Sequence, residues 1–163
     1  MKETLDRRTK WSYCVGATGR DAAYALVSMY LILYVQYTMN LTSAQFVVIS
    51  GAMIVCMVWD AINDLLMGII IENTHFKMGK FKPWILIGSV SNAVIIVCLF
   101  TIRPSGWGFV GFYSLFYLLW GMTYTMNDIA YWGVLPSLSS DSHTRDSLVT
   151  LMSICLLYTS DAA

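Results

Sequence analysis

One long apolar run constrains this chain more than any other feature. From Ala44 to Ile71 the residues are predominantly apolar, and the run is long enough to cross a bilayer as a helix, which takes about 20 residues. Two carboxylates, Asp60 and Asp64, lie near its middle. An Asp at the centre of a membrane helix costs roughly 2.5 to 3.5 kcal/mol on insertion scales, so such residues mark functional sites.

The polar residues of this run share one helical face. Residues at i, i+3 and i+4 lie together on a helix, so Asp60, Asn63 and Asp64 are expected to present clustered oxygens to one cavity. We interpret the cluster as half of a cation site. The alternatives are helix-end capping, or pairing of the two acids with a basic residue outside this sequence.

The composition indicates an integral membrane protein of the all-α class. The chain is 57% hydrophobic and 12% charged, whereas a soluble domain has about 25% charged residues. The formal net charge is zero, which gives no support to nucleic-acid binding. The four cysteines have no metal-ligand spacing. No phosphate-binding loop, H-E-x-x-H or G-x-S-x-G motif occurs, so the sequence does not predict an enzyme or a cofactor.

Apolar periodicity predicts four transmembrane helices and the start of a fifth. The four cover about residues 13–39, 44–71, 83–102 and 108–135, and the fifth begins near residue 148. Together, residues 1–152 are predicted to form a partial N-terminal transmembrane bundle. Residues 153–163 depart from the preceding pattern and are predicted to be a non-native tail. The chain is therefore expected to be a fragment of a longer protein.

The basic residues are unevenly distributed between the two sides of the predicted bundle. Positive loops stay on the cytoplasmic side, so we expect a multi-pass protein of the inner (plasma) membrane with a cytoplasmic N-terminus. The opposite side holds only Arg103. The residues of the cytoplasmic side are Lys2, Arg7, Arg8, Lys10, Lys77, Lys80, Lys82 and Arg145.

The fourth apolar run carries a second polar stripe. Tyr124 and Thr125 precede Asp128 by four and three residues, and Trp132 follows it by four, so all four fall on one side of a helix. A carboxylate accepts charge-assisted hydrogen bonds from sugar hydroxyls, and an aromatic ring stacks on the apolar face of a sugar. This stripe therefore predicts a sugar-binding surface.

Acidic residues outnumber basic ones at membrane depth. The predicted membrane segments contain one basic residue, Arg20, and four acidic ones, Asp21, Asp60, Asp64 and Asp128. Some of these carboxylates must therefore be protonated or be neutralised by a mobile cation. Hard monovalent cations such as Na⁺ prefer oxygen ligands, and the hydroxyl of Thr125 can add one. A purely structural Arg20–Asp21 ion pair is the alternative for the first helix.

Four ordered motifs resemble the melibiose carriers, members of the glycoside-pentoside-hexuronide:cation symporter family within the major facilitator superfamily. The resemblance runs from about Trp11 to Leu148. Its motifs are Gly19-Arg20-Asp21, Trp59-Asp60-Ala61-Ile62-Asn63-Asp64, Gly79-Lys80-Phe81-Lys82-Pro83-Trp84-Ile85-Leu86-Ile87-Gly88, and Trp120-Gly121-Met122-Thr123-Tyr124-Thr125 with Asp128.

The resemblance implies a twelve-helix fold of two six-helix halves, of which this chain is the first part of the N-terminal half. Such proteins couple uptake of a glycoside, such as a galactoside, to Na⁺, Li⁺ or H⁺ by alternating access, and this chain by itself is expected to be inactive. Its expected partners are the glycoside, the lipid bilayer and the remaining helices. The implied cation ligands are Asp60, Asn63, Asp64 and Thr125, and the implied sugar contacts are Asp21, Arg20, Tyr124, Asp128 and Trp132.

The chain departs from the melibiose carriers at three places. Met57 stands where those carriers have an Arg, three residues before the first Asp of the second-helix motif. Arg20 replaces a Lys, which retains charge but changes its geometry. Their sugar-contacting Arg early in the fifth helix is absent from Thr150-Leu151-Met152-Ser153. The alternative function is a non-transporting membrane sensor or scaffold whose acidic helix pairs with a basic partner.

Overall fold

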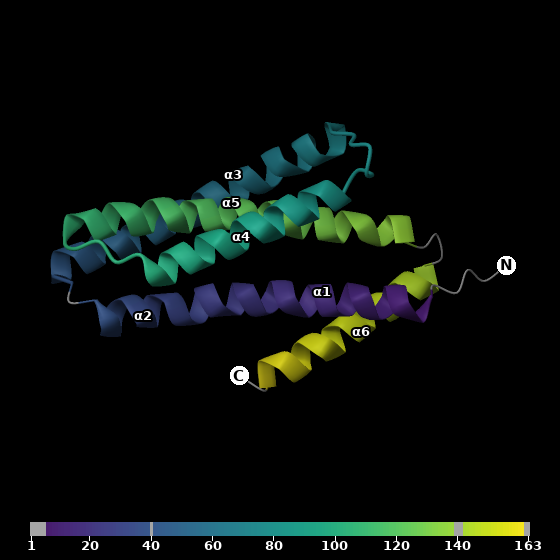
Figure 1. Ribbon diagram of the computed structural model, residues 1–163, viewed down its shortest axis with the longest axis horizontal. Helices are drawn as coiled ribbons and strands as arrows, with labels where there is room; N and C mark the ends of the chain where they lie inside the picture. The colour runs from purple at the N-terminus through teal and green to yellow at the C-terminus, as the bar shows by residue number, and fades with distance from the viewer. Residues whose placement is uncertain (1–5, 40, 139–141, 162–163) are drawn as a thin grey trace. The chain divides into compact units, whose positions relative to one another are not determined.

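A computed structural model describes residues 6–39, 41–138 and 142–161, without the side chains of 142–144 and 156–161. Within these residues all regular structure is helical, as the sequence predicts (Figure 1). The helices are α1 (Arg7–Ala25), α2 (Leu31–Thr38), α3 (Ser43–Asn73), α4 (Lys82–Thr101), α5 (Trp107–Leu138) and α6 (Ser142–Asp161), and a π-helical segment, Leu26–Tyr30, connects α1 to α2.

Two helices differ from the prediction. The helix expected over 13–39 begins at Arg7, and its α-helical hydrogen bonding is interrupted by the π segment Leu26–Tyr30. No Pro or Gly occurs in that segment, so the sequence does not mark the change. The fifth helix begins at Ser142 rather than near 148, so the polar residues before Leu148, which have no apolar periodicity, also belong to the helix. The predicted non-native tail, 153–163, lies partly outside the described residues, and its origin stays a prediction.

Local sequence explains where α3 and α4 begin. Thr42 and Gln45 form a reciprocal capping box: the backbone N–H of Gln45 donates to Thr42 Oγ1 at 3.4 Å, and the backbone N–H of Thr42 donates to Gln45 Oε1 at 3.0 Å. These bonds satisfy amides that have no partner within the helix. Pro83 occupies the first turn of α4, where its missing N–H costs nothing.

The chain divides into two compact units. The first contains residues 1–29 and 133–163, and the second contains residues 30–132. In the first unit, α1 packs against α6, and its buried residues include Tyr13, Cys14 and Ala17 of α1 and Leu148 and Met152 of α6. The N-terminal turns of both helices line one pocket, so the two helices run in the same direction.

The second unit holds α3 and α4 against α5. Tyr113 of α5 donates a hydrogen bond to the sulfur of Met53 at 3.8 Å, and Thr125, farther along α5, reaches Asp64, farther along α3. Partners that advance together show that α3 and α5 are parallel (Figure 1). Near the ends of α3 and α5, Met67, Ile71 and Ala130 form a small apolar core, which α4 residues help to cover.

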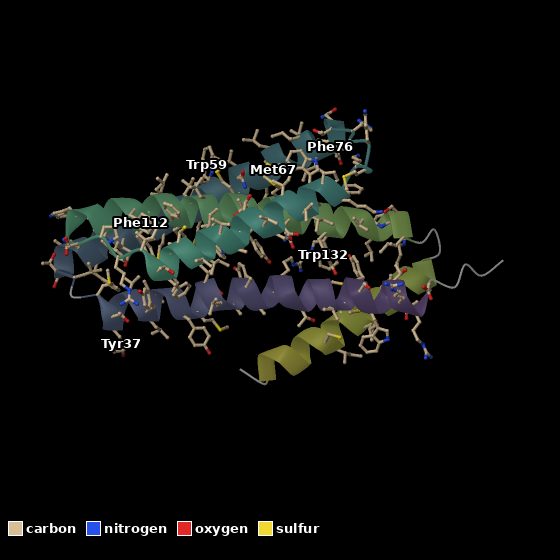
Figure 2. The ribbon with its side chains drawn as sticks, viewed as in Figure 1. Tyr37, Trp59, Met67, Phe76, Phe112 and Trp132 are labelled. Atoms are coloured by element: carbon tan, nitrogen blue, oxygen red, sulfur yellow. The ribbon has the colours of Figure 1, made fainter. Side chains whose placement is uncertain are left out.

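The second unit has an apolar core, but unlike a soluble protein it also exposes many large apolar side chains and buries several polar ones. Apolar side chains of α3 such as Ile54 and Leu65 are exposed, and Trp59 extends outward as well (Figure 2). The buried side chains include Gln45, Asn63, Asn92, Thr125 and Asn127. Polar groups turned inward and apolar groups turned outward are typical of a helix bundle in lipid.

Among the described helices, α3 and α4 are long and apolar enough to cross a membrane. The predicted first span does not meet that measure as a single α-helix, because the π segment divides it. Helix α5 has sufficient length but does not meet the hydropathy criterion, in which its Gly, Tyr and Trp residues score low. The membrane-spanning role of these two segments therefore stays a prediction.

Candidate functional site

The predicted cation ligands of α3 face α5. Thr125 Oγ1 donates a hydrogen bond of 3.0 Å to Asp64 Oδ1. Thr125 is buried, with 7% of its surface exposed, whereas Asp64 is exposed. One carboxylate oxygen of Asp64 is therefore held by α5.

Asp60 approaches the backbone of α5 one turn before Asp64. Its Oδ1 lies 2.6 Å from where a Cβ on Gly121 would stand, and its Cγ and Oδ2 lie 3.3 Å from that point. Gly121 and Thr125 are four residues apart on α5, as Asp60 and Asp64 are on α3. The contacts Asp60–Gly121 and Asp64–Thr125 therefore lie one helical turn apart along the two parallel helices. Only glycine leaves room for the Asp60 carboxylate in this position.

Asn63 completes the polar patch of α3. Only 2% of its surface is exposed, and its Nδ2 is buried with no hydrogen-bond partner among the described residues. Asp60 Oδ1 is likewise buried and has no such partner. Buried polar atoms are normally paired, so these two atoms have capacity for a ligand. The amide's oxygen and nitrogen are exchanged by a half-turn of the side chain, which would turn Asn63 Oδ1 to the same position.

The chemistry of this cluster suits a monovalent cation. It offers oxygens from two carboxylates, one amide and one hydroxyl, which are hard ligands. Neither Asp60 nor Asp64 forms an ion pair with a basic residue in the described part of the chain. No group of three or more His, Cys, Asp or Glu side chains that would hold a metal ion occurs among those residues.

Arg20 and Asp21 form an ion pair in the first unit. Arg20 Nη2 and Nε each lie 2.9 Å from Asp21 Oδ1, and the two side chains are 7% and 22% exposed. The alternative interpretation of a structural ion pair therefore has a geometric basis. A sugar-binding role for these two residues stays a prediction.

The predicted sugar stripe lies on α5 beside a row of aromatic side chains. Tyr124 stacks on Trp120, with ring centroids 5.9 Å apart and 26° between their planes. Asp128 is half-buried, and Trp132 is 42% exposed (Figure 2). The row as a whole contains Phe109, Tyr113, Tyr117, Trp120 and Tyr124. Within it, Tyr113 is buried, in agreement with a packing role.

Arg20 and Asp21 belong to the first unit, whereas Tyr124 and Asp128 belong to the second, as does Trp132. Their convergence on one sugar is therefore a prediction rather than an observation.

Polar contacts between α4 and α5 were not predicted from the sequence. Asn92 Nδ2 donates to Thr123 Oγ1 at 3.2 Å, and Asn127 Nδ2 donates to Ser89 Oγ at 2.9 Å. Gly88 allows α4 and α5 to approach closely, because a Cβ added to Gly88 would lie 3.0 Å from Asn127 Cβ and 3.1 Å from the backbone nitrogen of Asn127. These contacts position the helix that carries Thr125. The only sequence signal was an amide, Asn92, inside an apolar run.

The chain matches the family model described as MFS/sugar transport protein over residues 12–160. The match covers most of the sequence and agrees with the motif resemblance at the level of the family. It describes a family of transporters rather than enzymes.

Several curated relatives are similar over most of this chain. Lactose permease of Lactobacillus helveticus is 34% identical over 151 residues, which are 86% of this chain and 24% of that protein. The raffinose carrier protein of Pediococcus pentosaceus is 26% identical over 149 residues, 85% of this chain and 23% of that protein. The glucuronide carrier protein homolog of Escherichia coli strain K12 is 23% identical over 169 residues, 97% of this chain and 36% of that protein. The chain thus spans about a quarter of the length of the first two relatives.

Proposed function

We propose that this chain, which belongs to the MFS/sugar transport protein family, supplies the cation site of a glycoside symporter. Asp60, Asn63, Asp64 and Thr125 bind the coupling cation, which is Na⁺, Li⁺ or H⁺. The transported substrate is a glycoside such as a galactoside. Support for this class comes from relatives named for lactose, raffinose and a glucuronide.

The observation that carries the proposal is the pairing of α3 acids with α5 in the absence of a described counterion. Asp64 is held by Thr125, and Asp60 lies against Gly121 with a buried, unpartnered oxygen. Two carboxylates one helical turn apart repel each other when both are ionised. A bound cation or proton removes that repulsion and satisfies the free oxygen.

Coupling follows from where the ligands are placed. Thr125 of the cation site and Tyr124 and Asp128 of the proposed sugar site lie on the same stretch of α5. A cation that draws α3 and α5 together therefore also sets the position of the sugar-facing residues. By linkage, each ligand then raises the affinity of the other by the same factor. On the first helix, Arg20 and Asp21 contribute further sugar contacts.

The membrane arrangement is part of the same proposal. The N-terminus and the loop containing Lys77, Lys80 and Lys82 lie in the cytoplasm, because loops rich in Lys are retained there. The protein resides in the cell's plasma membrane and crosses it several times. The membership of this chain in a transporter family favours this function over the alternative of a non-transporting sensor or scaffold.

The test is uptake of a radiolabelled galactoside by cells that express a full-length protein carrying this chain. Uptake is measured with Na⁺, Li⁺ or a proton gradient alone. We expect Asp60→Asn and Asp64→Asn to lose cation stimulation of uptake. Glu72→Gln is the matched control, because Glu72 is an exposed carboxylate at the end of the same helix. Asp128→Asn is expected to lose sugar binding.

The outcomes separate the two halves of the proposal. Full cation stimulation in both α3 variants, at normal protein levels, would contradict the assignment of the cation site. Normal galactoside binding by Asp128→Asn would contradict the assignment of the sugar site, and it would not affect the assignment of the cation site.

A further inference from the structure

A pocket in the first unit has charged side chains at one end and apolar side chains at the other. It has a volume of about 630 Å³ and lies between the N-terminal turns of α1 and α6. That volume is in the range of sites for small organic ligands, about 300–1,000 Å³. None of the proposed cation or sugar ligands lines it. The lining residues are Arg7, Lys10, Trp11, Asp146, Ser147, Thr150, Leu151 and Ile154.

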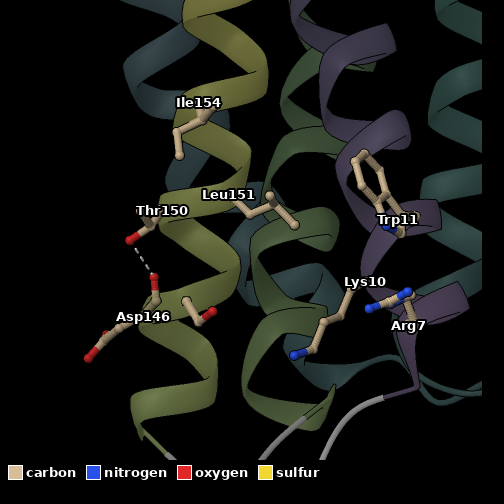
Figure 3. Close-up of a pocket in the computed structure, with 8 residues that line it drawn as sticks. Arg7, Lys10, Trp11, Asp146, Thr150, Leu151 and Ile154 are labelled. Carbon is tan, nitrogen blue, oxygen red and sulfur yellow. Dashed lines mark hydrogen bonds between the residues drawn. The ribbon is translucent and has the colours of Figure 1, made fainter.

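The charges lie at the end of the pocket where both helices begin. Arg7 and Lys10 stand on α1 and Asp146 on α6, whereas Leu151 and Ile154 lie one to two turns farther along α6 (Figure 3). Neither Arg7 nor Lys10 forms an ion pair with another described residue. The charges of the described lining residues therefore sum to one net positive charge at this end, and the lining at the other end is apolar.

We propose that this pocket binds the headgroup of an anionic phospholipid from the cytoplasmic leaflet. A phosphodiester has a single negative charge, which matches the net charge of the pocket. The cationic side chains hold the phosphate, and the first methylenes of an acyl chain lie against Leu151 and Ile154. Trp11, which is 55% exposed, lies in the same N-terminal turns of α1 as these cations, and Trp side chains favour the membrane interface.

This proposal rests on the proposed orientation, in which the N-terminus is cytoplasmic and the N-terminal ends of α1 and α6 therefore lie at the cytoplasmic leaflet. The basic residues that predict a cytoplasmic N-terminus include the same Arg7 and Lys10. Basic pockets between helices on the cytoplasmic side bind anionic headgroups, and each Lys or Arg near the surface adds attraction for anionic lipid. The proposed lipid site does not depend on the cation site of α3.

The test measures binding of a fluorescent phosphatidylglycerol to a full-length protein that carries this chain, purified in a neutral detergent. Lys10→Gln and Arg7→Gln should each weaken binding about 5-fold, the effect of one surface cation. Asp146→Asn should strengthen it, because a repulsive charge is removed. Arg8→Gln is the matched control, since Arg8 is exposed on the same turn but does not line the pocket. Lys10→Arg should retain binding.

Two outcomes would overturn the proposal. Equal losses in Lys10→Gln and Arg8→Gln would show that the lipid senses only the overall charge of the N-terminal segment. Complete displacement of the probe by millimolar inorganic phosphate would assign the pocket to a soluble anion instead of a lipid. Phosphatidylcholine serves as the competitor without net charge and should displace the probe weakly.

Discussion

Replacing Gly121 with Ala tests whether the position of the Asp60 carboxylate matters for cation binding. The added methyl carbon would stand 2.6 Å from Asp60 Oδ1, so this oxygen must move by about 0.8 Å to reach the 3.4 Å at which ordinary contact begins. The obstructing atom is the end of a side chain, so the carboxylate moves and the helix backbone does not. Binding sites tolerate about 0.5 Å of displacement.

We expect Gly121→Ala to reduce apparent cation affinity about 10-fold, equivalent to about 1.4 kcal/mol. The assay is the Na⁺ or Li⁺ concentration that gives half-maximal galactoside binding by a full-length protein carrying this chain. Gly111→Ala is the control on the same helix, because its added methyl group meets nothing within 4 Å. In a helix that control gains about 0.5–1 kcal/mol of stability from reduced backbone entropy. An unchanged half-maximal concentration in Gly121→Ala would refute the reasoning.

Two further predictions concern the contacts of α5. Gly88→Ala places a methyl group 3.0–3.2 Å from the Cβ, N and Cα of Asn127, which cannot move without the helix, so we expect a loss of about 1–3 kcal/mol in stability. Thermal unfolding measures this loss, and Gly68→Ala, which meets nothing within 4 Å, should cause none. Thr125→Val removes the hydrogen bond to Asp64 and should weaken cation activation about 10-fold, as expected for a bond to a charged group. Thr125→Ser should preserve activation, and equal loss in both variants would contradict a role for the hydroxyl.

Much of the helical architecture follows from local sequence. The start of α3 is set by the Thr42–Gln45 capping box, and Pro83 marks the first turn of α4. Both signals act within a few residues, so a single sequence contains them. The π segment Leu26–Tyr30 has no comparable signal, because its backbone geometry is not encoded by a Pro or Gly.

The candidate site was only partly predictable. Helical spacing placed Asp60 and Asp64 on one face, and the structure shows both turned toward α5. Spacing within one helix does not reveal which partner helix it meets or in what register. For this reason the sequence did not predict the close approach of Asp60 to Gly121 or the hydrogen bond between Asn92 and Thr123, which depend on how the helices pack.

The most direct measurement of the central claim is equilibrium binding of a labelled galactoside at increasing Na⁺ concentration. It compares the unmodified full-length protein with its Asp64→Asn variant. If the α3 acids bind the coupling cation, galactoside affinity will rise with Na⁺ in the unmodified protein and stay constant in the variant. The same Na⁺-dependent rise in both proteins would contradict the assignment.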